Sequence, residues 1–305
     1  MPQAPRWSWV VPVVAMFAYA WAAILIRWAG EASPFVIAFY RMAIATVVWA
    51  PFYALPTRDS APVRPTRRQW GLMVLAGLML CLHFATWISS LRYTTVSSSV
   101  FLILTQPFMV AIAAHFILRE RLGRMHMAAF ALTLAGSLLI FGGDFRLGRE
   151  YLFGDLLALI GAMAAGGYLL CARLVRGEDH SGEPGIPLQR YLPPVYAVSA
   201  VGLGLLALLH GDSFGPFSHQ TWLALLALGL VPTVIGHSLL NWSMRYLSAL
   251  AVNISLVGEP IGASLLAWFL LHEAPSDGLL AGSPLLVLAV VLVFLRPPRV
   301  SGETL

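Results

Sequence analysis

The segment that decides the fold occurs twice in the chain: RYTTVSSSVFLILTQPFMVAIAAHFILRE at residues 92–120 and RYLSALAVNISLVGEPIGASLLAWFLLHE at residues 245–273. Arginine, tyrosine, a mid-segment proline and a closing glutamate recur at a constant offset of 153 residues. At that offset Gln106 corresponds to Glu259 and Pro107 to Pro260. Matches of rare residue types in one register of an apolar chain indicate an internal repeat.

Both copies lie in a chain that is too apolar for a soluble domain. Of its 305 residues 59% are hydrophobic and 11% are charged, against about 25% charged residues in ordinary soluble proteins. A membrane-spanning helix needs roughly 20 apolar residues. The apolar runs predict ten spans, at about 8–28, 35–55, 70–90, 95–117, 125–143, 154–172, 191–210, 220–242, 249–271 and 278–295.

The repeat extends into the preceding spans, where Trp70 matches Trp222 and His83 matches His237. Five predicted crossings separate each unit from its copy, and an odd number inverts the copy in the membrane. Inverted repeats are typical of secondary transporters, whose halves rock about a site at their interface. We therefore predict an all-α integral membrane protein with ten transmembrane helices in two inverted five-helix repeats, residues 1–148 and 149–305.

Arginine distribution predicts the orientation of the chain. Fourteen arginines fall in one set of alternate connections and termini, whereas the opposite set holds only Arg92, Arg146 and Arg149. The positive-inside bias then makes both termini cytoplasmic. The same placement explains the net charge of +5 through membrane orientation, so we expect no nucleic-acid partner.

Several classes of chemistry find no support in the sequence. The chain contains no lysine, which excludes a P-loop lysine and a Schiff-base lysine. It has no nucleophile elbow, no H-E-x-x-H pair and no paired spacing of metal ligands. Cys81 and Cys171 lie in apolar runs and are expected to behave as small hydrophobes. We expect neither a cofactor, a metal nor an enzymatic activity.

The RY junction, the small-polar helix with its mid-span proline and the acidic R-E or H-E end resemble the EamA-type branch of the drug/metabolite transporter superfamily. The resemblance covers nearly the whole chain. It implies ten helices in two inverted repeats and export of small metabolites, most often amino acids, as in the YddG-like members. It also implies a bacterial inner membrane. The stretch 151–197 departs from the pattern, because it aligns poorly with residues 8–55 and carries a polar insertion at 177–187.

Glu259 is the only carboxylate near the middle of a predicted span. An ionised side chain there costs roughly 2.5 to 3.5 kcal/mol on insertion scales, so it should face the bundle interior or a wet cavity. Two interpretations stay open: a proton carrier, or a protonated side chain in a packing hydrogen bond. Its counterpart Gln106 cannot titrate, so any proton coupling would be asymmetric between the repeats.

Pro107 and Pro260 follow these two polar residues directly. Each proline removes the helix hydrogen bond to the carbonyl four residues earlier, which predicts a kink. Freed carbonyls at membrane depth are tolerated where they line a cavity. We therefore predict that both prolines are hinges, with a simple packing kink as the alternative.

Polar and aromatic side chains follow helical spacing on the neighbouring spans. Residues four apart share one helix face, and Ser99 with Gln106 forms a polar stripe. Span six carries small residues from Gly161 to Gly167 before a tyrosine, which permit close approach of either a helix or a substrate. The predicted substrate-binding residues of one central chamber are His83, Trp87, Ser99, Gln106, Tyr168, His237, Asn241 and Glu259.

Arg27 and Arg41 sit at the ends of the first two predicted spans and flank Glu31. An ion pair or gate is one interpretation, but snorkelling of both arginines to the membrane interface is the expected arrangement.

The sequence therefore predicts a secondary or facilitative transporter that exports small metabolites by alternating access at a central cavity. Amino acids, aromatic ones included, suit a chamber with one acid, neutral donors and aromatic walls. A lipophilic cation exporter is the alternative substrate class, and an intramembrane enzyme or a scaffold is the alternative from another class. Inverted repeats favour the transporter. The expected partners are a small-molecule substrate and the lipid bilayer, with proton coupling left open.

Overall fold

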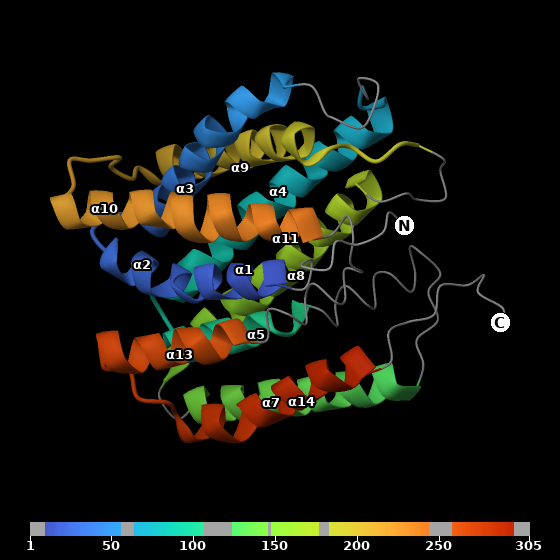
Figure 1. Ribbon diagram of the computed structural model, residues 1–305. Coiled ribbons are helices and arrows are strands. Elements are labelled where there is room, and N and C mark those ends of the chain that lie inside the picture. Colours follow the sequence, from blue (N-terminus) through green and yellow to red (C-terminus); the bar gives the residue numbers. More distant parts are fainter. Residues whose placement is uncertain are drawn as a thin grey trace, which may run out of the picture.

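The computed structural model describes residues 10–55, 64–106, 124–145, 148–176, 183–243 and 258–295, and these form a bundle of helices without a strand (Figure 1). Five of the described helices are long and apolar enough to cross a membrane, and shorter apolar helices accompany them. Large apolar side chains face outward, including Val47, Leu209 and Phe269, which are 72%, 85% and 69% exposed. Such an outer surface suits contact with lipid chains. The predicted all-helical membrane class is confirmed.

The first repeat comprises α1 (Val10–Ala20), α2 (Ala22–Trp28), α3 (Pro34–Trp49) with the 3₁₀ helix η1 (Ala50–Ala54), α4 (Arg67–Ser90), α5 (Val96–Ile103) and α7 (Arg124–Phe145). Hydroxyl side chains cap the N-termini of α3, α4 and α5. The Ser33 side chain accepts from the third residue of α3, and Thr66 forms a capping box with Gln69 at the start of α4. The Thr95 side chain accepts from the Ser98 N–H and caps α5.

The second repeat comprises α8 (Arg149–Arg176), α9 (Leu188–His210), α10 (His219–Leu228) with the π-helix η2 (Gly229–His237), α11 (Ser238–Ser243), α13 (Gly258–Leu271) and α14 (Asp277–Leu295). Helix α8 extends beyond the predicted span at both ends. The π-helix was not predicted, although its physical cause is in the sequence. Pro232 has no N–H to donate, and the widened turns of η2 accommodate it within the span.

Corresponding segments run in opposite directions through the bundle. One end of the bundle, here named the turn end, holds the turns 29–33, 91–95, 211–218 and 272–276, while α1 begins and α14 ends at the other (Figure 1). Helix α4 runs toward the turn end and α10 to α11 away from it; α5 runs away and α13 toward it. The matched Trp70 and Trp222 are each 40% exposed near opposite ends, as interfacial aromatic residues would be. The predicted inversion is confirmed.

Close packing across the repeats builds the interior. Helix α4 packs against α8 and α9, α3 packs against α9, and α7 pairs with α14 at one side of the bundle (Figure 1). The α7–α14 pair depends on Gly136 and Gly282, because a Cβ on Gly136 would lie 2.8 Å from the Gly282 carbonyl oxygen. Helices α1, α3, α4, α5, α8, η2, α11 and α13 surround a central cavity. The division of the chain at residue 148 remains a prediction.

Candidate functional site: a polar cavity between the repeats

A cavity lies inside the bundle, with walls from α1, α3, α4 and α5 of the first repeat and from α8, η2, α11 and α13 of the second. It offers about 70 Å³ to the centres of water-sized molecules, whereas one water needs roughly 10 to 15 Å³. Six of the eight predicted substrate-binding residues lie in its wall: His83, Trp87, Gln106, Tyr168, His237 and Glu259. The predicted hinge Pro260 lines it too, in the first turn of α13.

One wall is formed by His83 and Trp87 of α4, whose rings stack with their centroids 5.7 Å apart and 3° between their planes. His83 Nδ1 lies 2.9 Å from the carbonyl oxygen of Gly161 in α8, which fixes the orientation of the imidazole. A Cβ on Gly161 would lie 3.2 Å from Trp87 Cβ. Gly161, one of the small residues of span six, therefore permits close packing of α8 against α4. The indole N–H of Trp87 is buried without a hydrogen-bond partner among the described residues.

Another part of the wall is an aromatic cluster around His237. The Tyr19 ring meets His237 edge-on at 4.9 Å, and the Tyr168 ring lies 6.3 Å from it. Asn241 donates through Nδ2 to the Tyr168 hydroxyl at 2.6 Å and to the His237 carbonyl at 2.7 Å. Asn241 is not among the lining residues and orients Tyr168 and His237 from behind them, and its role in substrate binding stays a prediction. The matched histidines His83 and His237 meet the same cavity from the two repeats.

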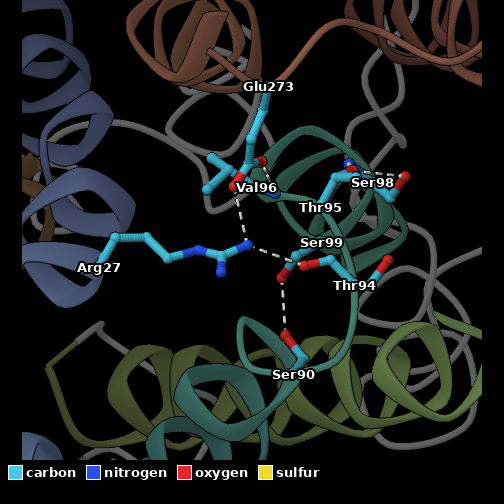
Figure 2. A network of polar contacts seen from close by, with 8 residues as sticks. All are labelled: Arg27, Ser90, Thr94, Thr95, Val96, Ser98, Ser99 and Glu273. Atoms are coloured by element: carbon cyan, nitrogen blue, oxygen red, sulfur yellow. Dashed lines mark hydrogen bonds and ion pairs between the residues drawn. The ribbon is translucent and has the colours of Figure 1, made fainter. Parts of the chain in front are cut away.

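Ser99, another predicted substrate-binding residue, is not among the residues that line the cavity. Ser99 is fully buried, and its hydroxyl pairs with that of Ser90 at 2.7 Å (Figure 2). The polar stripe of α5 turns Ser99 toward α4, and its contact with substrate stays a prediction. Pro107, the other predicted hinge, lies outside the described residues. Helix α5 ends at Ile103, the residue whose carbonyl Pro107 cannot engage.

Arg41 is the residue that sequence reasoning misplaced. It was expected to snorkel to the interface, yet it is 1% exposed and lines the cavity. Its Nε donates to the Thr233 hydroxyl at 2.7 Å, and its guanidinium carbon lies 4.3 Å from the Phe84 ring centroid and 5.8 Å from that of Trp87. The Thr233 hydroxyl donates in turn to the Leu228 carbonyl within the widened turns of η2. The sequence signal that was missed is Pro232. It lies in the π-helix η2, and the next residue of η2, Thr233, carries the hydroxyl that accepts from Arg41.

A second polar cluster ties the repeats together at the turn end. Figure 2 shows Arg27, at the end of α2, bound to Glu273 beyond α13 at 2.9 Å and to the Thr94 carbonyl at 3.1 Å. The other oxygen of Glu273 accepts the Val96 N–H at 2.8 Å and so caps the N-terminus of α5. Arg27 therefore forms an ion pair, and its partner, Glu273, belongs to the second repeat. We name Arg27, Thr94, Val96 and Glu273 the turn-end network.

Further contacts between the repeats join the turns 29–33 and 211–218. Ser33 donates to Asp212 at 2.6 Å, and the Ser218 N–H donates to Glu31 at 2.8 Å. These bonds from Ser218 lower the pKa of the exposed Glu31 carboxyl. The Tyr40 hydroxyl donates to the Phe214 carbonyl at 2.8 Å. The turn end is closed by bonds that cross between the repeats.

The inverted helices and the cavity between the repeats agree with the comparison to protein families. The model of the EamA-like transporter family matches residues 7–142 and again 152–295. The chain belongs to the EamA-like transporter family. It is therefore a multi-pass membrane transporter with the family domain in each half. The match does not distinguish the YddG-like subgroup, which stays a prediction.

Individual relatives agree with this assignment. An uncharacterized transporter of Archaeoglobus fulgidus is 25% identical over 251 residues, which are 80% of this chain and 82% of that protein. A solved crystal structure superimposes with a TM-score of 0.68 at 20% identity, covering 96% of this chain and 98% of that chain. This last likeness supports the fold alone.

Proposed function

We propose that this EamA-like transporter exports amino acids, aromatic ones included, by alternating access at the cavity between its repeats. The observation that carries the proposal is the composition of the cavity wall. It combines a buried arginine, a carboxyl side chain and several aromatic rings: Arg41, Glu259, Tyr19, Phe84 and Trp87. An amphipathic zwitterion complements a cation, an acid and apolar rings at the same time.

The same wall disfavours the alternative substrate class, a lipophilic cation. A second cation beside Arg41 in a low-dielectric cavity meets strong repulsion. Glu259 could offset that repulsion only in its ionised form, which itself is costly at this depth. The cavity therefore favours a substrate that brings its own negative charge.

Alternating access would use the turn-end network as one gate. The network joins Arg27 of the first repeat to Glu273 of the second and lies between the cavity and that end of the bundle. Opening at the turn end requires this ion pair to separate and the Val96 N–H to lose its bond to Glu273. Partly exposed ion pairs contribute only about 1 kcal/mol, so such a gate can open on the time scale of transport.

The coupling ion and orientation complete the proposal. Glu259 is the candidate proton carrier, and substrate and proton would compete for its carboxylate. Both termini would be cytoplasmic, as the arginine distribution favours, so the turn end would face outward from a bacterial inner membrane.

Transport by the purified protein in proteoliposomes tests the proposal. We expect labelled L-phenylalanine to accumulate by counterflow against unlabelled amino acid, and tetraphenylphosphonium not to compete. Empty liposomes and liposomes with the unlabelled substrate omitted are the controls. Counterflow of the cation with no movement of any amino acid would replace this substrate class by the lipophilic cations.

A further inference from the structure

The side chain of Arg41 is buried well inside the membrane span. Arg41 lies seven residues after the first residue of α3, which corresponds to a depth of about 10 Å at 1.5 Å per residue. The side chain is 1% exposed. An arginine in the membrane interior costs roughly 2.5 to 3.5 kcal/mol on insertion scales, so its charge requires compensation.

The compensation that the protein supplies is incomplete. One neutral hydroxyl, on Thr233, accepts from Nε, and the Phe84 ring lies against the guanidinium. In the described part of the chain no carboxylate forms an ion pair with Arg41, Glu259 included. One terminal nitrogen, NH1, is buried with no hydrogen-bond partner among the described residues. Buried guanidinium groups normally have such partners.

The position of the Arg41 guanidinium suits it to bind a ligand. Arg41 lines the cavity, so its side chain lies beside the space that a ligand would occupy. A guanidinium presents its donors as a planar fork that matches the two oxygens of a carboxylate. The Thr233 bond and the Phe84 ring hold the fork in place before a ligand arrives.

We propose that Arg41 binds the carboxylate of the substrate and makes the cavity selective for carboxylate-bearing amphipathic molecules. This inference rests on the proposed transport function and names the residue that sets its substrate class. The substrate's negative charge pairs with Arg41, its ammonium faces Glu259, and its apolar group lies along the Trp87 side of the wall. In an alternative role Arg41 is only a structural link between α3 and η2. The two roles differ in whether the loss of affinity in an Arg41 variant depends on the carboxylate of the ligand.

Three ligands that share one ring separate these roles: L-phenylalanine, 3-phenylpropionate without the amine, and phenethylamine without the carboxylate. Their binding to the purified transporter in lipid nanodiscs is measured by calorimetry. For Arg41→Gln we expect both carboxylate ligands to lose at least about tenfold in affinity, since a hydrogen-bonded charge pair is removed. Phenethylamine should bind unchanged or more tightly. The matched control Arg64→Gln, at an exposed arginine, should bind all three like the wild type.

Two further comparisons cover a variant that fails to fold. L-phenylalanine methyl ester, tested on the wild type, should bind at least about tenfold more weakly than L-phenylalanine. Arg41→Lys keeps the charge without the fork and should weaken the carboxylates selectively, though less than glutamine does. Equal losses for all three ligands in Arg41→Gln, or an ester that binds as tightly as the acid, would overturn the proposal.

Failure of the transport function gives a different pattern. If the wild type binds no amino acid but binds 3-phenylpropionate in an Arg41-dependent way, the amino acid function is wrong and the carboxylate site stands. Wild-type protein that binds none of the carboxylates contradicts both.

Discussion

The cavity and the turn-end network each combine one arginine of the first repeat with one glutamate of the second, yet the two pairs are arranged differently. At the turn end Arg27 and Glu273 lie 2.9 Å apart, and both make further bonds to backbone groups of the α4–α5 turn and α5. In the cavity no ion pair joins Arg41 and Glu259 within the described residues, although both line the same space. The difference indicates that paired charges hold helices together, whereas separated charges leave room for a ligand.

The largest contrast is expected between the two glutamates in transport. Glu259→Gln removes only the titratable group, because glutamine already stands at the matched position Gln106. We expect exchange of substrate to persist and accumulation driven by a pH gradient to be lost. Glu273→Gln keeps an acceptor for the Val96 N–H, so it should change the rate and retain coupling. Proteoliposomes with and without an imposed pH gradient measure both, and unchanged accumulation by Glu259→Gln would make this residue structural.

The two arginines should affect stability in opposite directions. Arg41→Leu removes a buried charge without an ion-pair partner among the described residues, so we expect the ligand-free protein to gain about 1 kcal/mol in stability. Arg27→Leu breaks an ion pair and a bond to the Thr94 carbonyl, so it should lose about 1 kcal/mol. Thermal unfolding followed by tryptophan fluorescence in the absence of substrate measures both. Shifts of the same sign would remove the distinction between the two regions.

A smaller effect is expected from the ring beside Arg41. Trp87→Ala removes the stacked partner of His83 and an aromatic face near the guanidinium, so aromatic amino acids should bind several-fold to about tenfold more weakly. Membrane insertion should be unaffected. Trp268→Ala, at a ring that is 49% exposed on the outer surface, is the matched control. Equal losses in the two variants would show that tryptophan content, and not the cavity wall, governs binding.

The smallest effect concerns pH at the turn end. Hydrogen bonds from Ser218 lower the pKa of Glu31 below its ordinary value of 4.5, so the contact stabilises the fold above that pH and is lost as pH falls through the lowered pKa. The stability difference between the wild type and Glu31→Gln should therefore shrink as pH is lowered below 4.5. Because the carboxylate is exposed, the difference is small. A difference that grows in acid would contradict the assigned bond.

The fold could be predicted because residues of rare types recur in register in the two copies of the repeat. An odd number of crossings between the copies then requires the second copy to be inverted in the membrane. The meeting of His83 and His237 followed from that symmetry. Helical spacing was less informative for Ser99 and Asn241, because it identifies residues that share a face and not the neighbour that the face meets. Arg41 was misplaced for a related reason: snorkelling is available to any arginine near a span end, and only the position of Thr233 in η2 shows where this guanidinium is held.

A structure of the transporter with L-phenylalanine bound tests most directly whether the cavity between the inverted repeats is the substrate site. We expect the ligand in the cavity, with its carboxylate within hydrogen-bond distance of the Arg41 guanidinium and its ring along the Trp87 side of the wall. The turn-end network should remain closed in the conformation described here, with Arg27 bound to Glu273. A ligand bound outside the cavity, or inside it with the carboxylate turned away from Arg41, would contradict the proposed site.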